Sequence, residues 1–142
     1  MADKMRILVV EDDREFARLM SASLQEIGCD VQIAFNGGDG LELATENKFD
    51  LITLDVNLPD ISGFEICREL KQRHISYRTP IVFVAGRATD EDRKRAFELD
   101  AVEFFEKPVR LREFIARISA VTGHQFTVPN IDLPERGTAD AG

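Results

Sequence analysis

Acidic side chains stand at the ends of two short apolar segments of this chain. The stretch LVVEDD, residues 8–13, runs from three apolar residues into Glu11, Asp12 and Asp13, and the stretch LITLD ends at Asp55. Carboxylates crowded beside buried strands repel one another and lose hydration, so a positive partner is expected. Magnesium prefers oxygen ligands and usually takes one or two carboxylates together with waters and phosphate oxygens. The pattern therefore predicts a Mg²⁺ site formed by Asp12 or Asp13 together with Asp55.

A lysine follows a third apolar segment. Lys107 comes directly after VEFFE, residues 102–106. An ammonium group next to a cation held by carboxylates indicates a phosphate beside that cation. Two alternatives stay open at this point: Asp13 could simply cap a helix, and Lys107 could be a solvated surface residue.

The elements that must position these side chains alternate along the chain. Segments of strand length and apolar composition occur at 6–10, 31–35, 51–55, 81–85 and 102–106. Helical spacing of apolar residues predicts helices from about Phe16 to Ile27, over 39–47 and 63–73, after a Thr89 cap, and over 111–121. Such alternation predicts a doubly wound α/β fold with a parallel sheet and helices on both faces, in which ligands bind at the carboxyl ends of the strands.

Composition limits the classes of protein that fit. The chain has 142 residues, 44% hydrophobic and 31% charged, with a net charge of −8, which argues against direct binding to nucleic acid. No segment is long and apolar enough for membrane insertion or a signal peptide, so we expect a cytoplasmic protein. Cys29 and Cys67 have no metal-ligand spacing and are interpreted as reduced thiols. We expect one domain over 1–123 and a mobile or loosely docked tail over 124–142.

Four motifs together resemble those of a known family. The stretches LVVEDD, LITLDVNLPDISGFEI, TPIVFVAG and AVEFFEKP are similar, in order and separation, to the motifs of the CheY-like response-regulator receiver domain. The resemblance covers about residues 5–122. It implies the flavodoxin-like strand order 2-1-3-4-5 and a role in two-component signal transduction, in which a histidine kinase or phosphotransfer protein donates a phosphoryl group. It also implies that the domain catalyses its own phosphorylation and dephosphorylation, although it is not a conventional enzyme.

The same resemblance implies roles for individual residues. Asp55, in DVNLPDISG, would be the phosphoacceptor, and Asp12 and Asp13 would be the acidic pair that holds Mg²⁺. The backbone carbonyl of Asn57 would be a further metal ligand, and Lys107 would contact the phosphoryl group.

Other positions would shape the site or report its state. A cis bond between Lys107 and Pro108 would aim the lysine at the pocket, while Pro59 and Gly63 would shape the loop after the phosphoacceptor. Phe104 occupies the family's aromatic switch position, although a core role is an equal alternative.

One position departs from the family pattern. Ala85 stands where receiver domains place Thr or Ser, and a shift of one residue offers only Val84 or Gly86. A hydrogen bond to a charged oxygen contributes about 1.5–3 kcal/mol, so we expect phosphorylation to survive but its coupling to the following loop to be weaker or different. Arg87 and Thr89 are candidates to reach the phosphate from that loop.

The sequence thus predicts a stand-alone receiver, a magnesium-dependent phosphoacceptor whose output is contact with another protein. The oligomeric state is open, and a dimer is one possibility. A pseudo-receiver that acts without phosphate is the main alternative, favoured by Ala85. A phosphohydrolase using Asp55 is a third, but Asn57 stands where a second acid would be expected.

Overall fold

The strands form one parallel sheet. The structure, a computed structural model, describes residues 4–75 and 78–126. Its sheet has the order β2-β1-β3-β4-β5, which confirms the predicted flavodoxin-like α/β fold. The strands are β1 (Arg6–Val10), β2 (Asp30–Ala34), β3 (Leu51–Asp55), β4 (Ile81–Ala85) and β5 (Glu103–Glu106).

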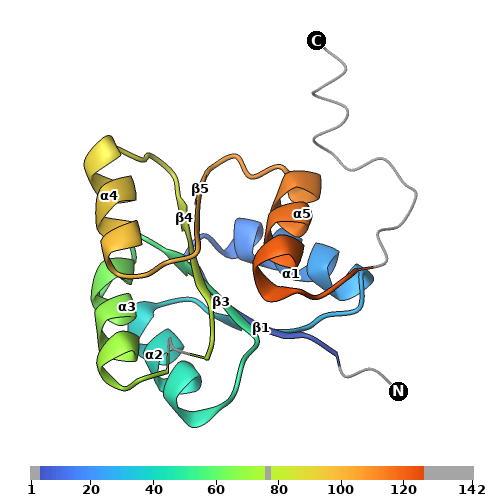
Figure 1. The fold of residues 1–142 in the computed structure, drawn as a ribbon, viewed down its shortest axis with the longest axis horizontal. Helices are drawn as coiled ribbons and strands as arrows, with labels where there is room; N and C mark the ends of the chain where they lie inside the picture. Colours follow the sequence, from blue (N-terminus) through green and yellow to red (C-terminus); the bar gives the residue numbers. More distant parts are fainter. Residues whose placement is uncertain (1–3, 76–77, 127–142) are drawn as a thin grey trace.

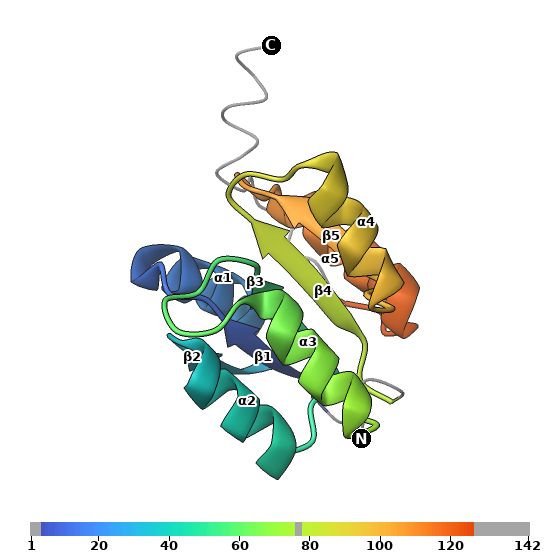
Figure 2. The ribbon, with the colours of Figure 1, turned by 90° about the vertical axis from the view of Figure 1, so that its left-hand side faces the viewer.

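Helices cover both faces of this sheet. Helices α2, α3 and α4 lie on one face, and α1 and α5 lie on the other (Figures 1 and 2). Each follows one strand along the chain, and α1 to α4 lie in the crossover connections that parallel strands need. The helices are α1 (Arg14–Glu26), α2 (Gly37–Glu46), α3 (Gly63–Gln72), α4 (Asp90–Glu98) and α5 (Leu111–Thr122).

Two apolar clusters, one on each face, hold the layers together. On the face of α2, α3 and α4 the cluster includes Leu54, Phe64 and Phe83, and on the face of α1 and α5 it includes Val9 and Phe114. Every residue of β3 and β4 is buried, as continuous apolar strands in the centre of a parallel sheet should be. The core therefore fixes the positions of the strand ends.

Local signals set the helix boundaries close to the predicted ones. Gly28 and Gly123 have positive φ angles of 98° and 76°, which glycine adopts without steric cost, and they follow the last turns of α1 and α5. Thr89 caps α4 as predicted. Helix α2 begins earlier than predicted, because the side chain of Asn36 caps it and Gly37 becomes its first residue.

The described part of the chain has no helix long and apolar enough to cross a membrane. The tail proposed for 124–142 falls mostly outside the described residues. Of its described part, Phe126 packs against the cluster on the α1 and α5 face.

Candidate functional site

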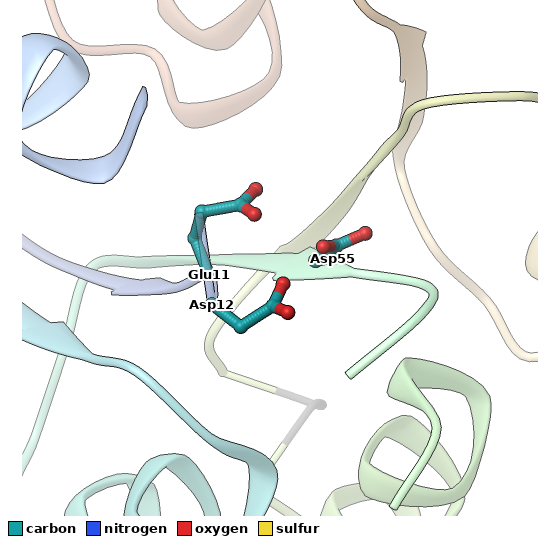
Figure 3. A group of neighbouring side chains, drawn as sticks. All are labelled: Glu11, Asp12 and Asp55. Atoms are coloured by element: carbon teal, nitrogen blue, oxygen red, sulfur yellow. The ribbon is translucent and has the colours of Figure 1, made fainter. Parts of the chain in front are cut away.

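Three carboxylates meet at the carboxyl ends of β1 and β3. One oxygen from each of Glu11, Asp12 and Asp55 lies within 4.8 Å of the other two. Figure 3 shows Glu11 and Asp12 leaving the end of β1 beside Asp55 at the end of β3. Strand register explains the meeting, because Val10 pairs with Leu54 and the next residues along the two strands are Glu11 and Asp55. Buried apolar strands thus carry a concentrated negative charge to one edge of the sheet.

Lys107 supplies the positive charge at this edge. Its Nζ lies 2.9 Å from Oε1 of Glu11 and 3.9 Å from Oδ2 of Asp55. The backbone N–H of Lys107 donates a hydrogen bond to the carbonyl of Ala85 at 2.8 Å, and the Lys107–Pro108 peptide bond is cis. The ammonium also lies 4.7 Å from the centre of the Phe16 ring. Lys107 therefore lies against the acidic cluster and is not a freely solvated surface lysine.

Burial dominates the electrostatics of Asp55, which is only 5% exposed. Loss of hydration and then the neighbouring Glu11 charge raise the pKa of Asp55 to about 7, against the opposing effect of Lys107. The backbone N–H of Asn57 also donates to Oδ1 of Asp55 at 3.2 Å. Without a bound cation, the Asp55 carboxyl group thus loses its proton at a higher pH than an ordinary aspartate does.

The second acid of the cluster differs from the sequence-based assignment of Asp13. The carboxylate of Asp13 accepts a hydrogen bond from the backbone N–H of Phe16 at 3.1 Å and caps α1. Glu11 takes the place beside Asp55, because its backbone N–H still bonds to Ala34 and so continues the strand. A helix cap at Asp13 is consistent with the sequence alone, but the position of Glu11 depends on strand register.

The loop between β3 and α3 is closed tightly against the site. Gly63 donates its backbone N–H to the carbonyl of Val56 at 2.9 Å. A Cβ atom at Gly63 would lie 2.3 Å from the carbonyl oxygen of Asp55, so only glycine fits there without displacing that backbone. Pro59 is exposed at the outer part of the loop, and the backbone of Asn57 lies at its start. Glycine at 63 is therefore a packing requirement of the strand that carries Asp55.

The end of β4 offers no hydroxyl group to the site. Ala85 is fully buried. The hydroxyl of Thr89 accepts from the N–H of Asp92 at 3.0 Å, and the Asp92 carboxylate accepts from the N–H of Thr89 at 3.2 Å, so Thr89 serves as a helix cap. Arg87 is exposed on the same loop.

Phe104 lies in the core. Its ring is 3% exposed, with its centre 6.2 Å from that of Phe83. The guanidinium of Arg93 on α4 lies 5.1 Å from the Phe104 ring centre and forms an ion pair with Glu106 at 3.0 Å. These contacts fit the core interpretation and leave a switching role as a prediction.

The cluster suits a hard divalent cation. Its donors are all carboxylate oxygens, the type that Mg²⁺ prefers. Ligands of an octahedral Mg²⁺ lie about 3 Å apart when adjacent and about 4 Å apart when opposite, so the spacing within the cluster needs only small side-chain adjustments. A cation there would also offset the repulsion between Glu11 and Asp55. The residues present therefore fit the magnesium ion that the sequence predicts.

Comparisons with known proteins agree with this geometry. Residues 7–119 match the family of the response regulator receiver domain. The response regulator ArlR of Staphylococcus saprophyticus is 37% identical over 128 residues, which cover 90% of this chain and 57% of that protein. The chain thus spans little more than half the length of this relative.

Solved structures show the same fold. A CheY-like receiver domain protein from Methanospirillum hungatei superposes with a TM-score of 0.80 at 26% identity, covering 85% of this chain and 95% of its own. The BeF3-activated receiver domain of DrrB, a Thermotoga maritima protein, gives 0.76 at 30% identity, covering 86% and 100%. The family match extends over most of the chain and includes every strand end that builds the acidic cluster. The chain therefore belongs to the response-regulator receiver domain family of two-component signal transduction.

Proposed function

We propose that Asp55 is the phosphoacceptor of this receiver and that its phosphorylation requires Mg²⁺. The observation that carries the proposal is the cluster of Glu11, Asp12 and Asp55 with Lys107 beside it at the end of the central strands. A carboxylate attacking a phosphoryl group brings two anions together, so the reaction needs positive charge at that point. The site has both a lysine and ligands for a cation.

Each residue has a defined task in this proposal. An oxygen of Asp55 attacks phosphorus, an O–P bond forms, and the P–N bond of a phosphohistidine donor breaks, leaving the imidazole. Lys107 shifts from Glu11 toward the transferred group and neutralises one of its oxygens. Glu11, Asp12, Asp55 and the Asn57 carbonyl would hold Mg²⁺. The ion would supply charge neutralisation and alignment of the reactants.

The proposed partners follow from this chemistry. The donor is a histidine kinase or a histidine phosphotransfer protein, and the output is contact with a further protein. For the domain boundaries we propose a receiver over 1–123 followed by a tail.

Intact mass spectrometry tests the proposal directly. The protein is incubated with acetyl phosphate and Mg²⁺, and its mass is followed over time. We expect a gain of one phosphoryl group that is prevented by a chelator and that peptide mapping places on Asp55. A folded protein that gains no phosphoryl group from acetyl phosphate or from a phosphorylated histidine donor would instead support the pseudo-receiver. Continuous turnover of a chromogenic phosphate ester would support the phosphohydrolase.

Replacing Ala85 tests what a hydroxyl would add. Ala85→Thr introduces a donor for a phosphoryl oxygen, and Ala85→Val adds nearly the same volume without the donor. We expect phosphorylation to shift the amide resonances of residues 86–89 more in Ala85→Thr than in the wild type, because a bond of about 1.5–3 kcal/mol then couples phosphate to loop. The measurement is NMR of each protein before and after phosphorylation. Equal resonance shifts in the Thr and Val variants would show that the hydroxyl does not couple the phosphate to the loop.

A further inference from the structure

Asp60 joins the loop after the phosphoacceptor to the start of α2. Its Oδ1 accepts the backbone N–H of Gly37 at 2.8 Å, and its Oδ2 accepts that of Gly38 at 2.8 Å. Asp60 itself is exposed. The two successive amides hold the pKa of Asp60 below its ordinary value, so the carboxylate stays charged against the positive end of the helix.

The bond does more than cap the helix. Asn36 already caps α2, since its Oδ1 accepts the N–H of Asp39 at 2.8 Å. Asp60 takes the two remaining free amides of the first turn from a loop 22 and 23 residues away in sequence. The two caps therefore satisfy the same helix terminus, but only Asp60 connects it to the β3–α3 loop.

Close packing reinforces this connection. A Cβ atom at Gly37 would lie 2.4 Å from Cγ1 of Ile61 and 3.1 Å from its carbonyl oxygen. The loop thus lies directly on the first turn of α2 at Asp60 and Ile61. At its base the loop is closed by the Gly63 to Val56 hydrogen bond. The loop is thus held by contacts of Asp60 and Ile61 with α2 and by the hydrogen bond at its base. Its first exposed residue is Asn57.

We propose that Asp60 is a positioning residue that fixes the β3–α3 loop on α2 and so holds the Asn57 carbonyl in place for Mg²⁺. This inference rests on the proposed function, in which that carbonyl is a metal ligand. Asp60 touches neither the metal nor the phosphoryl group in this role. It acts by lowering the freedom of the loop before the ion binds.

Calorimetric Mg²⁺ titration of the metal-free protein tests the proposal. We expect Asp60→Ala to weaken Mg²⁺ binding about threefold to tenfold. Residues that contact a metal ligand directly usually contribute about tenfold or more, and Asp60 acts from further away through the loop. Asp60→Asn keeps one oxygen acceptor and should fall between Asp60→Ala and the wild type. Asn36→Ala removes the other cap of α2, and Asp39→Ala removes one charge from the same helix turn. Both controls should leave the affinity within about twofold of the wild type.

A change on the helix side of the contact provides a second test. Gly37→Ala places a methyl group against Ile61 and should weaken Mg²⁺ binding as Asp60→Ala does. Both changes break the same contact between the β3–α3 loop and α2. The fold loss of Mg²⁺ affinity in the double variant should therefore be smaller than the product of the two single losses. Multiplicative losses would mean that the two residues act separately and would overturn the proposal.

Amide hydrogen exchange separates this inference from the proposed function. In the metal-free protein, Asp60→Ala should speed exchange at Gly37, Gly38 and the loop amides, whereas Asn36→Ala should speed it mainly within α2. Wild-type protein that binds Mg²⁺ and accepts phosphate while Asp60→Ala binds Mg²⁺ equally well would overturn the positioning role alone. Wild-type protein that neither binds Mg²⁺ nor accepts phosphate would overturn the proposed function and, with it, this role.

Discussion

Asp55→Asn is expected to abolish the phosphoryl adduct completely under conditions in which the wild-type protein is fully modified. The amide oxygen is a poor nucleophile, and no other carboxylate of the cluster occupies the same place at the end of β3. Asn keeps the volume of Asp, so the fold should persist. The measurement is intact mass after incubation with acetyl phosphate and Mg²⁺, with circular dichroism to confirm folding.

The same variant should be more stable than the wild type when no metal is present. In the folded protein, burial and the Glu11 charge raise the pKa of Asp55 from 3.8 to about 7, so Asp55 keeps its proton where the unfolded chain has lost it. The folded state then binds more protons than the unfolded state, and wild-type stability falls as pH rises from about 4 to about 7. Asn has no such dependence. We expect Asp55→Asn to gain up to a few kcal/mol over the wild type at pH 8 and little at pH 4.

Urea denaturation of both proteins at pH 4 and pH 8, with a chelator present, measures the difference in their free energy of unfolding. Added Mg²⁺ should narrow the difference at pH 8 by stabilising the wild type, since the ion favours the ionised carboxylate. A variant that is no more stable than the wild type at pH 8 would contradict the raised pKa of the buried Asp55 carboxyl. An adduct that persists in Asp55→Asn would place the phosphoacceptor elsewhere.

Glu11→Gln and Asp12→Asn are each expected to weaken Mg²⁺ binding by about tenfold or more, whereas Asp13→Ala should barely change it. A tenfold loss of affinity corresponds to about 1.4 kcal/mol. The Coulomb attraction between a carboxylate and a divalent ion a few ångströms away is at least that large, so removing the carboxylate charge should weaken binding at least tenfold. Asp13 instead caps α1 at 3.1 Å from the Phe16 nitrogen. Its loss should lower the free energy of unfolding by about 1 kcal/mol.

Calorimetry measures the Mg²⁺ affinity of the three variants, and urea denaturation measures their free energy of unfolding. Glu11→Gln also removes the charge that opposes ionisation of Asp55, so without metal it should lower the pKa of Asp55 toward its ordinary value. The titration of the Asp55 carboxyl carbon by NMR reports that change. Strong loss of Mg²⁺ binding in Asp13→Ala, with binding intact in Glu11→Gln, would restore the pairing of Asp12 and Asp13 that the sequence favours.

Much of the fold follows from local patterns. Apolar runs such as LITLD and IVFVA are long enough only for strands, and apolar residues one turn apart mark the helices between them. Because the strands are parallel, their carboxyl ends all lie at one edge of the sheet, so the pattern predicts Asp55 and Lys107 at the same edge. Their strands are separated by β4, and the 3.9 Å approach of the two side chains is seen only in the structure. Glycines and caps beyond the last apolar residues mark the helix ends, because those signals are also local.

Which acids meet was decided by tertiary structure. Side chains alternate between the faces of a strand, so a register shift of one residue would change which acid faces Asp55. The pairing of Val10 with Leu54 places Glu11 there and leaves Asp13 to cap α1. Asp60 has no local signal at all, since its partners Gly37 and Gly38 are brought to it only when α2 and α3 pack side by side on the sheet. The sequence by itself determined the elements and the edge of the sheet where chemistry occurs, and the packing of those elements decided which side chains share it, because contacts between distant segments depend on register and not on local pattern.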